Sequence, residues 1–297
     1  MDTHRGVRSL ESAAISAFVP VVAMLPFSLL ALAVFWLVAH PFVDVSYWWF
    51  VAVFLAGSVL LFIRPFQAAV LTPLLRARRP SGAEVDVIEP LWAEIAQANH
   101  LPPQRYILRV LPSEELNAFA CGGHLVVVTS YAVTQLSTAE LRGVLAHELS
   151  HHLGLHTLAI TLGHWLSIPV VILARIGFFL ENVATAAAGS FGRRSPLIET
   201  LGSVAAVIIR GLSWVFTAGL RASDALTNVV GHSSEFEADQ RAVRMGFGPE
   251  LAVALRHVLA SGTGARPVGW RARLAASHPP ARTRVARIEA LLRHPAR

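Results

Sequence analysis

Lysine is missing from this chain of 297 residues, so all 25 of its basic residues are arginine. Charged residues of both signs make up only 15% of the sequence, against about a quarter in soluble globular proteins. The single cysteine, Cys121, excludes an intramolecular disulfide and is typical of a reducing compartment. We interpret Cys121 as a small residue at a turn rather than as a nucleophile or a redox switch.

The arginines give the chain a net charge of +6 and a sequence pI near 10.8, which is also typical of nucleic-acid-binding proteins. They are scattered, however, and gather mainly beside apolar stretches, without a basic-aromatic motif. Attraction to anionic lipid headgroups is the simpler explanation. We therefore expect a lipid bilayer as a partner and no nucleic acid.

Hydrophobic residues make up 54% of the sequence, and its mean hydropathy is +0.53. Residues 13–39 and 45–63 carry no charged side chain, and Trp48 and Trp49 form an aromatic pair near one end of the second stretch. Each stretch is long enough to cross roughly 30 Å of hydrocarbon as a helix. The first is too long for a signal-peptide core, so we expect it to be retained.

Two further apolar stretches, residues 157–180 and 197–220, contain charged side chains such as Arg175 and Arg210. We expect spanning or deeply inserted helices, and a buried hairpin lying on or partly in the membrane is the alternative. The predicted organisation is an N-terminal hairpin (1–75), a first soluble part (76–156), a second apolar pair (157–221) and a second soluble part (222–297).

Arginines beside the first two spans predict their orientation. Arg5 and Arg8 precede the first span and Arg64 follows the second, whereas the loop at residues 40–44 has none. The positive-inside rule then places both ends of this hairpin in the cytoplasm. We expect a multi-pass protein of the cell membrane whose soluble part faces the cytoplasm, although Arg193 and Arg194 oppose the rule if their loop lies outside.

Residues 147–151 read HELSH, an HExxH motif. A capping box of Ser137 and Glu140 precedes it, and leucine and valine follow at helical spacing, so a helix is predicted. His147 and His151 then lie one turn apart on one face and can bind one zinc ion. Glu148, about 100 degrees around the helix, is placed to act as a base on an attacking water.

A zinc site needs a third protein ligand, and His152, His156 and a distant acidic residue compete for this role. The pattern HExxHxxGxxH fails by one position, because Thr157 stands where histidine is required. His152 points about 100 degrees away from His151. In the segment 234–239, SEFEAD, Glu235 and Asp239 share a helical face, so one carboxylate can bind metal while the other accepts an imidazole N–H. Glu237 faces elsewhere.

HELSH paired with a later EFEAD resembles the M48 family of membrane-associated zinc peptidases. Residues 116–120, 122–129 and 277–279 resemble further segments of that family, and the resemblance covers about residues 84–156 and 230–290. The layout is more similar to the bacterial HtpX heat-shock protease group than to the larger CAAX-processing group. Cys121 and the pair Ser233-Ser234 depart from the family pattern and bear on subgroup rather than on zinc chemistry.

The resemblance implies one zinc ion per chain, held by His147, His151 and Glu235, with Asp239 supporting a ligand. Glu148 is then the catalytic base. The further roles implied are an oxyanion contact by His278 and bracing of a loop by Arg284.

Coarse periodicity predicts a helix over residues 88–99 and strands over 106–111, 117–120 and 124–129. The fold class is therefore α+β, a multi-pass α-helical membrane protein whose soluble domain resembles the gluzincin-type zinc peptidase fold and carries a small β-sheet. We expect strand 124–129, with Val126, Val127 and Val128, to be a sheet edge that binds extended substrate beside Asn117 and Ala118. The alternative is a central strand.

The predicted function is zinc-dependent hydrolysis of peptide bonds in misfolded or membrane proteins, as in stress-related protein quality control. A CAAX-type processing peptidase is the alternative within the family. A non-enzymatic membrane scaffold with a structural zinc is the alternative from another class, against which an intact Glu148 argues. The sequence favours no particular oligomeric state or substrate.

Overall fold

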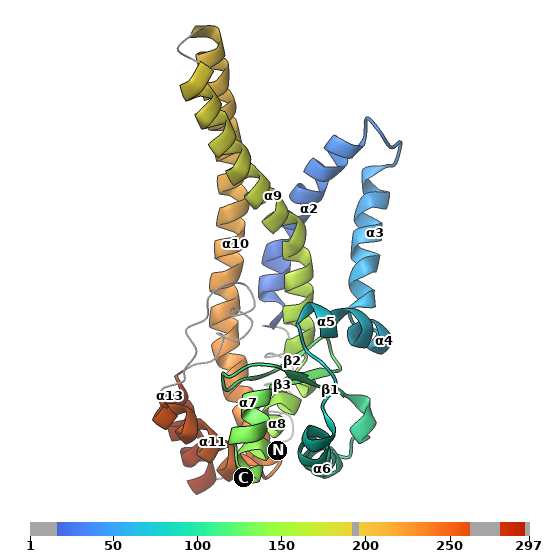
Figure 1. Ribbon diagram of the computed structural model, residues 1–297, viewed down its shortest axis with the longest axis vertical. Coiled ribbons are helices and arrows are strands. Elements are labelled where there is room, and N and C mark those ends of the chain that lie inside the picture. Colours follow the sequence, from blue (N-terminus) through green and yellow to red (C-terminus); the bar gives the residue numbers. More distant parts are fainter. Residues whose placement is uncertain (1–16, 192–195, 262–279, 295–297) are drawn as a thin grey trace, which may run out of the picture. The chain divides into compact units, whose positions relative to one another are not determined.

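The computed structural model describes residues 17–191, 196–261 and 280–294, which form mostly helices and one small sheet (Figure 1). These residues fall into two compact units. The sheet unit comprises the described parts of residues 1–17, 59–161 and 228–297. The apolar unit comprises residues 18–58 and the described parts of 162–227.

The apolar unit contains α2 (Val19–Ala39), most of α3 (Tyr47–Leu60), and parts of α9 (His156–Phe191) and α10 (Pro196–Arg244). Its buried core joins α2, α9 and α10 and is centred on Met24, Leu166, Val170 and Phe216. Most other large apolar side chains of this unit are exposed, as expected for helices that face lipid. By length and composition, three of the described helices are long and apolar enough to cross a membrane, or four if a bent pair counts as one span.

Helices α9 and α10 lie side by side (Figure 1). Gly177 permits this close approach, because a Cβ there would lie 2.0 Å from the hydroxyl of Ser213. Arg210 Nε lies 2.7 Å from Glu181 Oε1, so an ion pair also joins the two helices. Helix α10 continues past residue 221, where the sequence suggested a domain boundary. The four-part division of the chain remains a prediction.

The sheet unit is built on strands β1 (Ile107–Leu111), β2 (Ala118–Cys121) and β3 (Leu125–Thr129), in the order β1-β3-β2. Strand β3 pairs with β1 in parallel and with β2 antiparallel. The prediction that residues 124–129 form a sheet edge is therefore wrong, and the central-strand alternative is right. The side chains of Val126, Val127 and Val128 are at most 1% exposed. Their unbroken apolar run is typical of a strand covered on both faces.

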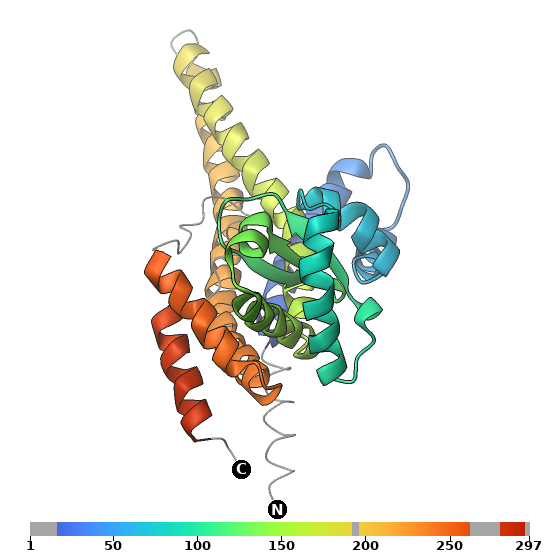
Figure 2. The ribbon, with the colours of Figure 1, turned by 60° about the horizontal axis from the view of Figure 1, so that its bottom comes forward.

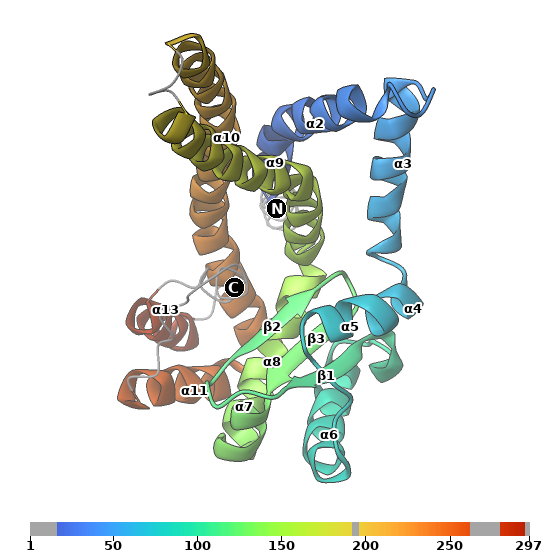
Figure 3. The same cartoon turned by 45° about the horizontal axis from the view of Figure 1, so that its top comes forward.

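Strand β3 lies between β1 and β2 (Figure 3), and alternate residues of β3 face two different cores. Val126 and Val128 pack with α6 (Gly82–Ala98) and α8 (Thr138–Leu153). Leu125 and Val127 pack with a short helical segment on the other face. That segment consists of α4 (Arg64–Phe66), η1 (Gln67–Leu71) and α5 (Thr72–Leu74).

The remaining helices of the sheet unit are η2 (Pro103–Arg105), α7 (Ser130–Gln135), α11 (Gly248–Ser261) and α13 (Ala281–Arg293). Helices α11 and α13 lie against each other through a small apolar core that includes Leu251, Val285 and Ile288 (Figure 2). Helix α6 begins six residues earlier than the predicted helix at 88–99, because Ser81 and Glu84 form a capping box.

Candidate metal centre

Helix α8 carries the HExxH motif on a well-defined element. Ser137 is its N-cap, and the side chain of Glu140 accepts a hydrogen bond from the Ser137 backbone N–H at 2.7 Å, as the capping box predicts. Its C-terminal turn is held from α10, where Arg241 Nη1 donates to the Ser150 carbonyl at 2.9 Å. A Cβ at Gly154 would lie 2.2 Å from that guanidinium, so any larger residue there would displace the side chain of Arg241.

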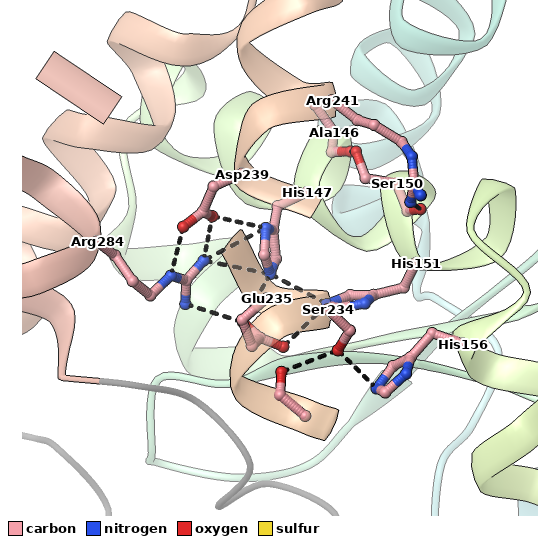
Figure 4. Close-up of polar contacts among 11 residues, drawn as sticks. Ala146, His147, Ser150, His151, His156, Ser234, Glu235, Asp239, Arg241 and Arg284 are labelled. Atoms are coloured by element: carbon pink, nitrogen blue, oxygen red, sulfur yellow. Dashed lines mark hydrogen bonds and ion pairs between the residues drawn. The ribbon is translucent and has the colours of Figure 1, made fainter. Parts of the chain in front are cut away.

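The two histidines of α8 meet Glu235 of α10 in a buried cluster (Figure 4). His147 Nε2 lies 3.2 Å from His151 Nε2 and 3.3 Å from Glu235 Oε2. His151 Nε2 lies 3.1 Å from Glu235 Oε1. All three residues are at most 6% exposed. The packing of α8 against α10 thus brings His147 and His151 together with Glu235, which lies at least 84 residues later in the chain.

This donor set fits zinc. Bonds of about 2.0–2.1 Å in a tetrahedral site place two ligand atoms about 3.3 Å apart, close to the separations between these nitrogen and carboxylate oxygen atoms. Two imidazoles and one carboxylate are also the ligands of catalytic zinc sites, which keep a position for water or substrate. Exposed acidic clusters are common without a metal, but this cluster is buried.

The charges around the cluster point to a divalent cation as well. Glu148, Glu235 and Asp239 are each at most 3% exposed, and the buried guanidinium of Arg284 lies 3.3 Å from Glu235 and 2.7 Å from Asp239. As metal ligands, both imidazoles must be neutral, so they would not compensate the charge of these carboxylates. Buried charge is costly without a partner, and a divalent cation bound here would stabilise these carboxylates directly.

Asp239 and Arg284 position His147. Asp239 Oδ1 lies 3.1 Å from His147 Nδ1, so it can accept that N–H and leave Nε2 for a metal. Arg284, from α13, donates to both Asp239 oxygens at 2.9 and 2.7 Å and lies 3.3 Å from Glu235 Oε2. Its Nη2 atom is also 3.2 Å from His147 Nε2. Arg284 therefore contacts the cluster itself, beyond the loop-bracing role that the sequence suggested.

Burial and the charge of Arg284 lower the pKa of His147. Its hydrogen bonds to Asp239 and Glu235 raise that pKa more, to about 9. Without a metal, His147 therefore holds a proton at neutral pH. Because a ligand must be deprotonated, binding of a metal displaces this proton.

The other candidate ligands have different partners. His152 lies 3.2 Å from the Leu125 carbonyl and 3.3 Å from the Thr157 hydroxyl, and burial lowers its pKa to about 3. His156 lies 3.0 Å from the hydroxyl of Ser234.

Glu237 lies 3.6 Å from Arg241, away from the cluster. Sequence patterns do not predict the hydrogen bonds of Ser234 and Arg241, because these bonds join residues far apart in the chain and follow no motif.

The remaining predicted site residues are spread more widely. Asn117 is hydrogen-bonded through its carbonyl to the Thr129 backbone N–H at 3.0 Å, directly before β2, and Ala118 begins that strand. Both therefore border the sheet beside α8, against which β2 packs. His278 lies outside the described residues. Cys121 ends β2, and burial raises the pKa of its thiol to about 12, which agrees with a structural role.

The family model of peptidase family M48 matches residues 85–292. The chain belongs to this family. Two curated relatives, both named protease HtpX homolog, come from Kineococcus radiotolerans and Salinibacter ruber. The first is 29% identical and the alignment covers 73% of this chain and 77% of the relative. The second is 25% identical, and the alignment covers 75% of this chain and 81% of the relative.

The crystal structure of Ste24p from S. mikatae has a similar fold, with a TM-score of 0.52 at 17% sequence identity. The match covers 87% of this chain, which spans 61% of the length of that protein. The family and the HtpX homologues identify this M48 peptidase as a metalloprotease of the HtpX type, and its apolar helices agree with a membrane protein.

Proposed function

We propose that this M48 peptidase binds one zinc ion through His147, His151 and Glu235 and uses it to hydrolyse peptide bonds. The observation that carries the proposal is the buried cluster of donor atoms 3.1–3.3 Å apart on α8 and α10. Bound there, zinc would lower the pKa of a water molecule and polarise the scissile carbonyl.

Glu148 is the proposed general base. It follows the ligand His147 on α8 and is buried, with 3% of it exposed, and its negative charge is among the causes that raise the pKa of Arg284. A carboxylate in this position can take the proton of the attacking water and deliver it to the leaving amine. Arg284 keeps Asp239 charged and in place, and Asp239 fixes the ring of His147. The oxyanion contact proposed for His278 rests on the family resemblance.

Strand β2 is the proposed substrate-binding strand, in place of β3. Within the described sheet β2 has a neighbour on one side only. Thr129 N–H donates to the Asn117 carbonyl, and in an antiparallel pair such bonded positions alternate. The backbone groups of Ala118 and Ala120 therefore point away from β3, toward the free edge. An extended peptide added there would be bound mainly through its backbone.

Recognition of backbone suits a protease that accepts many unfolded segments. We therefore propose misfolded or membrane proteins as substrates, in a cell membrane, with the sheet unit in the cytoplasm. A CAAX-type peptidase would need an intramembrane chamber of more spans than the three or four candidates in the described chain.

Replacement of Glu148 tests this function. Glu148→Gln in the full chain should keep the zinc content and lower hydrolysis of an unfolded membrane protein by several orders of magnitude, because only the proton acceptor is removed. Glu237→Gln, on α10 and paired with Arg241, is the matched control and should remain active. Proteolysis by Glu148→Gln at the rate of the control would rule out the mechanism.

A further inference from the structure

The short helical segment between the second apolar stretch and the first soluble helix has two very different faces. We call residues 63–76, which include α4, η1 and α5, the elbow segment. Its inner face covers one side of the sheet, where Leu71 and Leu75 pack against Leu125 and Val127. The elbow segment is therefore part of the sheet unit rather than a loose connection.

Gln67 fixes the elbow segment to the sheet. Its side chain is fully buried, and its Nε2 donates to the carbonyls of Leu61 at 2.7 Å and Gly122 at 2.9 Å. Gly122, in the turn between β2 and β3, has a φ of +67, and a Cβ there would lie 2.8 Å from that nitrogen. On the other side, the Gly122 N–H donates to the Thr161 hydroxyl at 3.0 Å. The turn and the elbow segment thus form one rigid contact.

The outer face of the elbow segment is apolar and exposed. Ile63, Val70 and Leu74, at the start, middle and end of the segment, are 43%, 42% and 53% exposed. Pro65 and Pro73 are exposed as well. A soluble segment would carry polar side chains at most of its exposed positions, so this strip of exposed apolar side chains indicates a partner.

Arginines surround this strip. Arg64, Arg76, Arg79 and Arg105 are exposed, and none of them has a carboxylate partner among the described residues, whereas Arg78 pairs with Glu84 at 2.6 Å. Arg64 Nη2 donates to the Gln104 carbonyl at 2.6 Å, which brings it beside Arg105. An apolar strip bordered by unpaired cations is complementary to the boundary between anionic headgroups and acyl chains.

We propose that the elbow segment lies in the headgroup region of an anionic bilayer and seats the sheet on the membrane surface. This inference rests on the proposed membrane insertion of the preceding apolar stretch, to which the elbow segment is joined directly in the chain. Its 11 helical residues from Arg64 to Leu74 are about 16 Å long, too short to cross about 30 Å of hydrocarbon alone. The hydrogen bond from Gln67 to Gly122 also connects the elbow segment to the turn that joins β2 to β3.

Depth measurements with lipid quenchers test this placement. The full chain in a Cys121→Ser background would carry a single bimane-labelled cysteine at Val70 or Leu74, in vesicles of phosphatidylcholine and phosphatidylglycerol. Nitroxides attached near the headgroup should quench both positions roughly twofold more than nitroxides deep in the acyl chains. Val253→Cys, at an exposed position of α11, is the aqueous control, and Leu30→Cys, at an exposed position of α2, is the control for the hydrocarbon.

The two controls separate the possible failures. Suppose that Leu30 is quenched from the acyl chains but Val70 and Leu74 are quenched no more than Val253. This result would overturn the placement of the elbow segment and leave the membrane insertion of the protein intact. Deep quenching at Val70 equal to that at Leu30 would overturn it in favour of a spanning segment. Absence of quenching at Leu30 would overturn the membrane placement on which both the inference and the proposed localisation rest.

The arginines are tested in the same assay. Arg64→Gln combined with Arg76→Gln should lower the quenching at Val70 in anionic vesicles toward its value in pure phosphatidylcholine. Arg287→Gln, an exposed arginine of α13, should not change it. Equal effects of the two sets of substitutions, or none from either, would contradict recognition of anionic headgroups.

Discussion

At the scale of single residues, the metal centre depends on one buried arginine whose positive charge is shared by two carboxylates. Arg284 is 5% exposed and shared between Asp239 and Glu235, so its charge is held by carboxylates on α10. Removing one partner of a buried ion pair leaves the others without compensation and costs about 3–5 kcal/mol. Arg284 should therefore contribute to folding as well as to the orientation of His147.

Substitution of Arg284 tests this balance. Arg284→Met should lower the stability of the metal-free protein by about 3–5 kcal/mol, or its midpoint of thermal unfolding by roughly 10 °C. Zinc should restore much of the loss, since a divalent cation compensates the same carboxylates. Arg287→Met, three residues later over the ring of Phe236, should have little effect. An equal midpoint for the two variants without metal would argue against the role of Arg284.

At the scale of elements, local patterns predicted α8 well. Its capping box, its helical spacing and the shared face of His147 and His151 are properties of neighbouring residues. The position of β3 was predicted wrongly because order in a sheet depends on pairing between distant segments. The unbroken run from Leu125 to Val128 was the available signal, since an edge strand with one solvated face alternates apolar and polar residues. The elbow segment follows no recognisable pattern, because prolines and a π-helical turn interrupt it.

Strand β2 gives a sharper prediction than β3. Ala120→Pro removes an N–H that points to the free edge, so it should raise the KM for peptide cleavage while the zinc content stays unchanged. Phe119→Pro removes an N–H directed to β3 and should unfold the sheet, with loss of zinc. Cleavage and zinc content measured on the same samples distinguish the two. Loss of zinc from both variants, or an unchanged KM for Ala120→Pro, would refute the edge assignment.

At the scale of the whole molecule, the sequence predicts apolar helices and a divided peptidase domain because hydropathy and motifs are read along the chain. The family assignment follows from the same motifs and agrees with the comparison over residues 85–292. Membrane orientation depends on the charges of loops. It remains a prediction, and part of it falls on Arg193 and Arg194, which lie outside the described residues.

Reporter fusions test the orientation. A reporter placed after Arg79 should be cytoplasmic and one placed near Phe42 should be outside, because arginines border the first hairpin at its ends and are absent from its turn. Phosphatase and fluorescent-protein reporters at each site give opposite signals and serve as mutual controls. A cytoplasmic signal near Phe42 would overturn the orientation.

The zinc content of two glutamate variants tests the central claim most directly. Glu235 and Glu237 lie on the same helix two residues apart, but only Glu235 lies beside His147 and His151. Purified wild-type protein and Glu237→Ala should each hold about one zinc per chain, whereas Glu235→Ala should lose most of it because a ligand is removed. Equal zinc content in the two variants would contradict the assignment of Glu235 and the metal centre described for this chain.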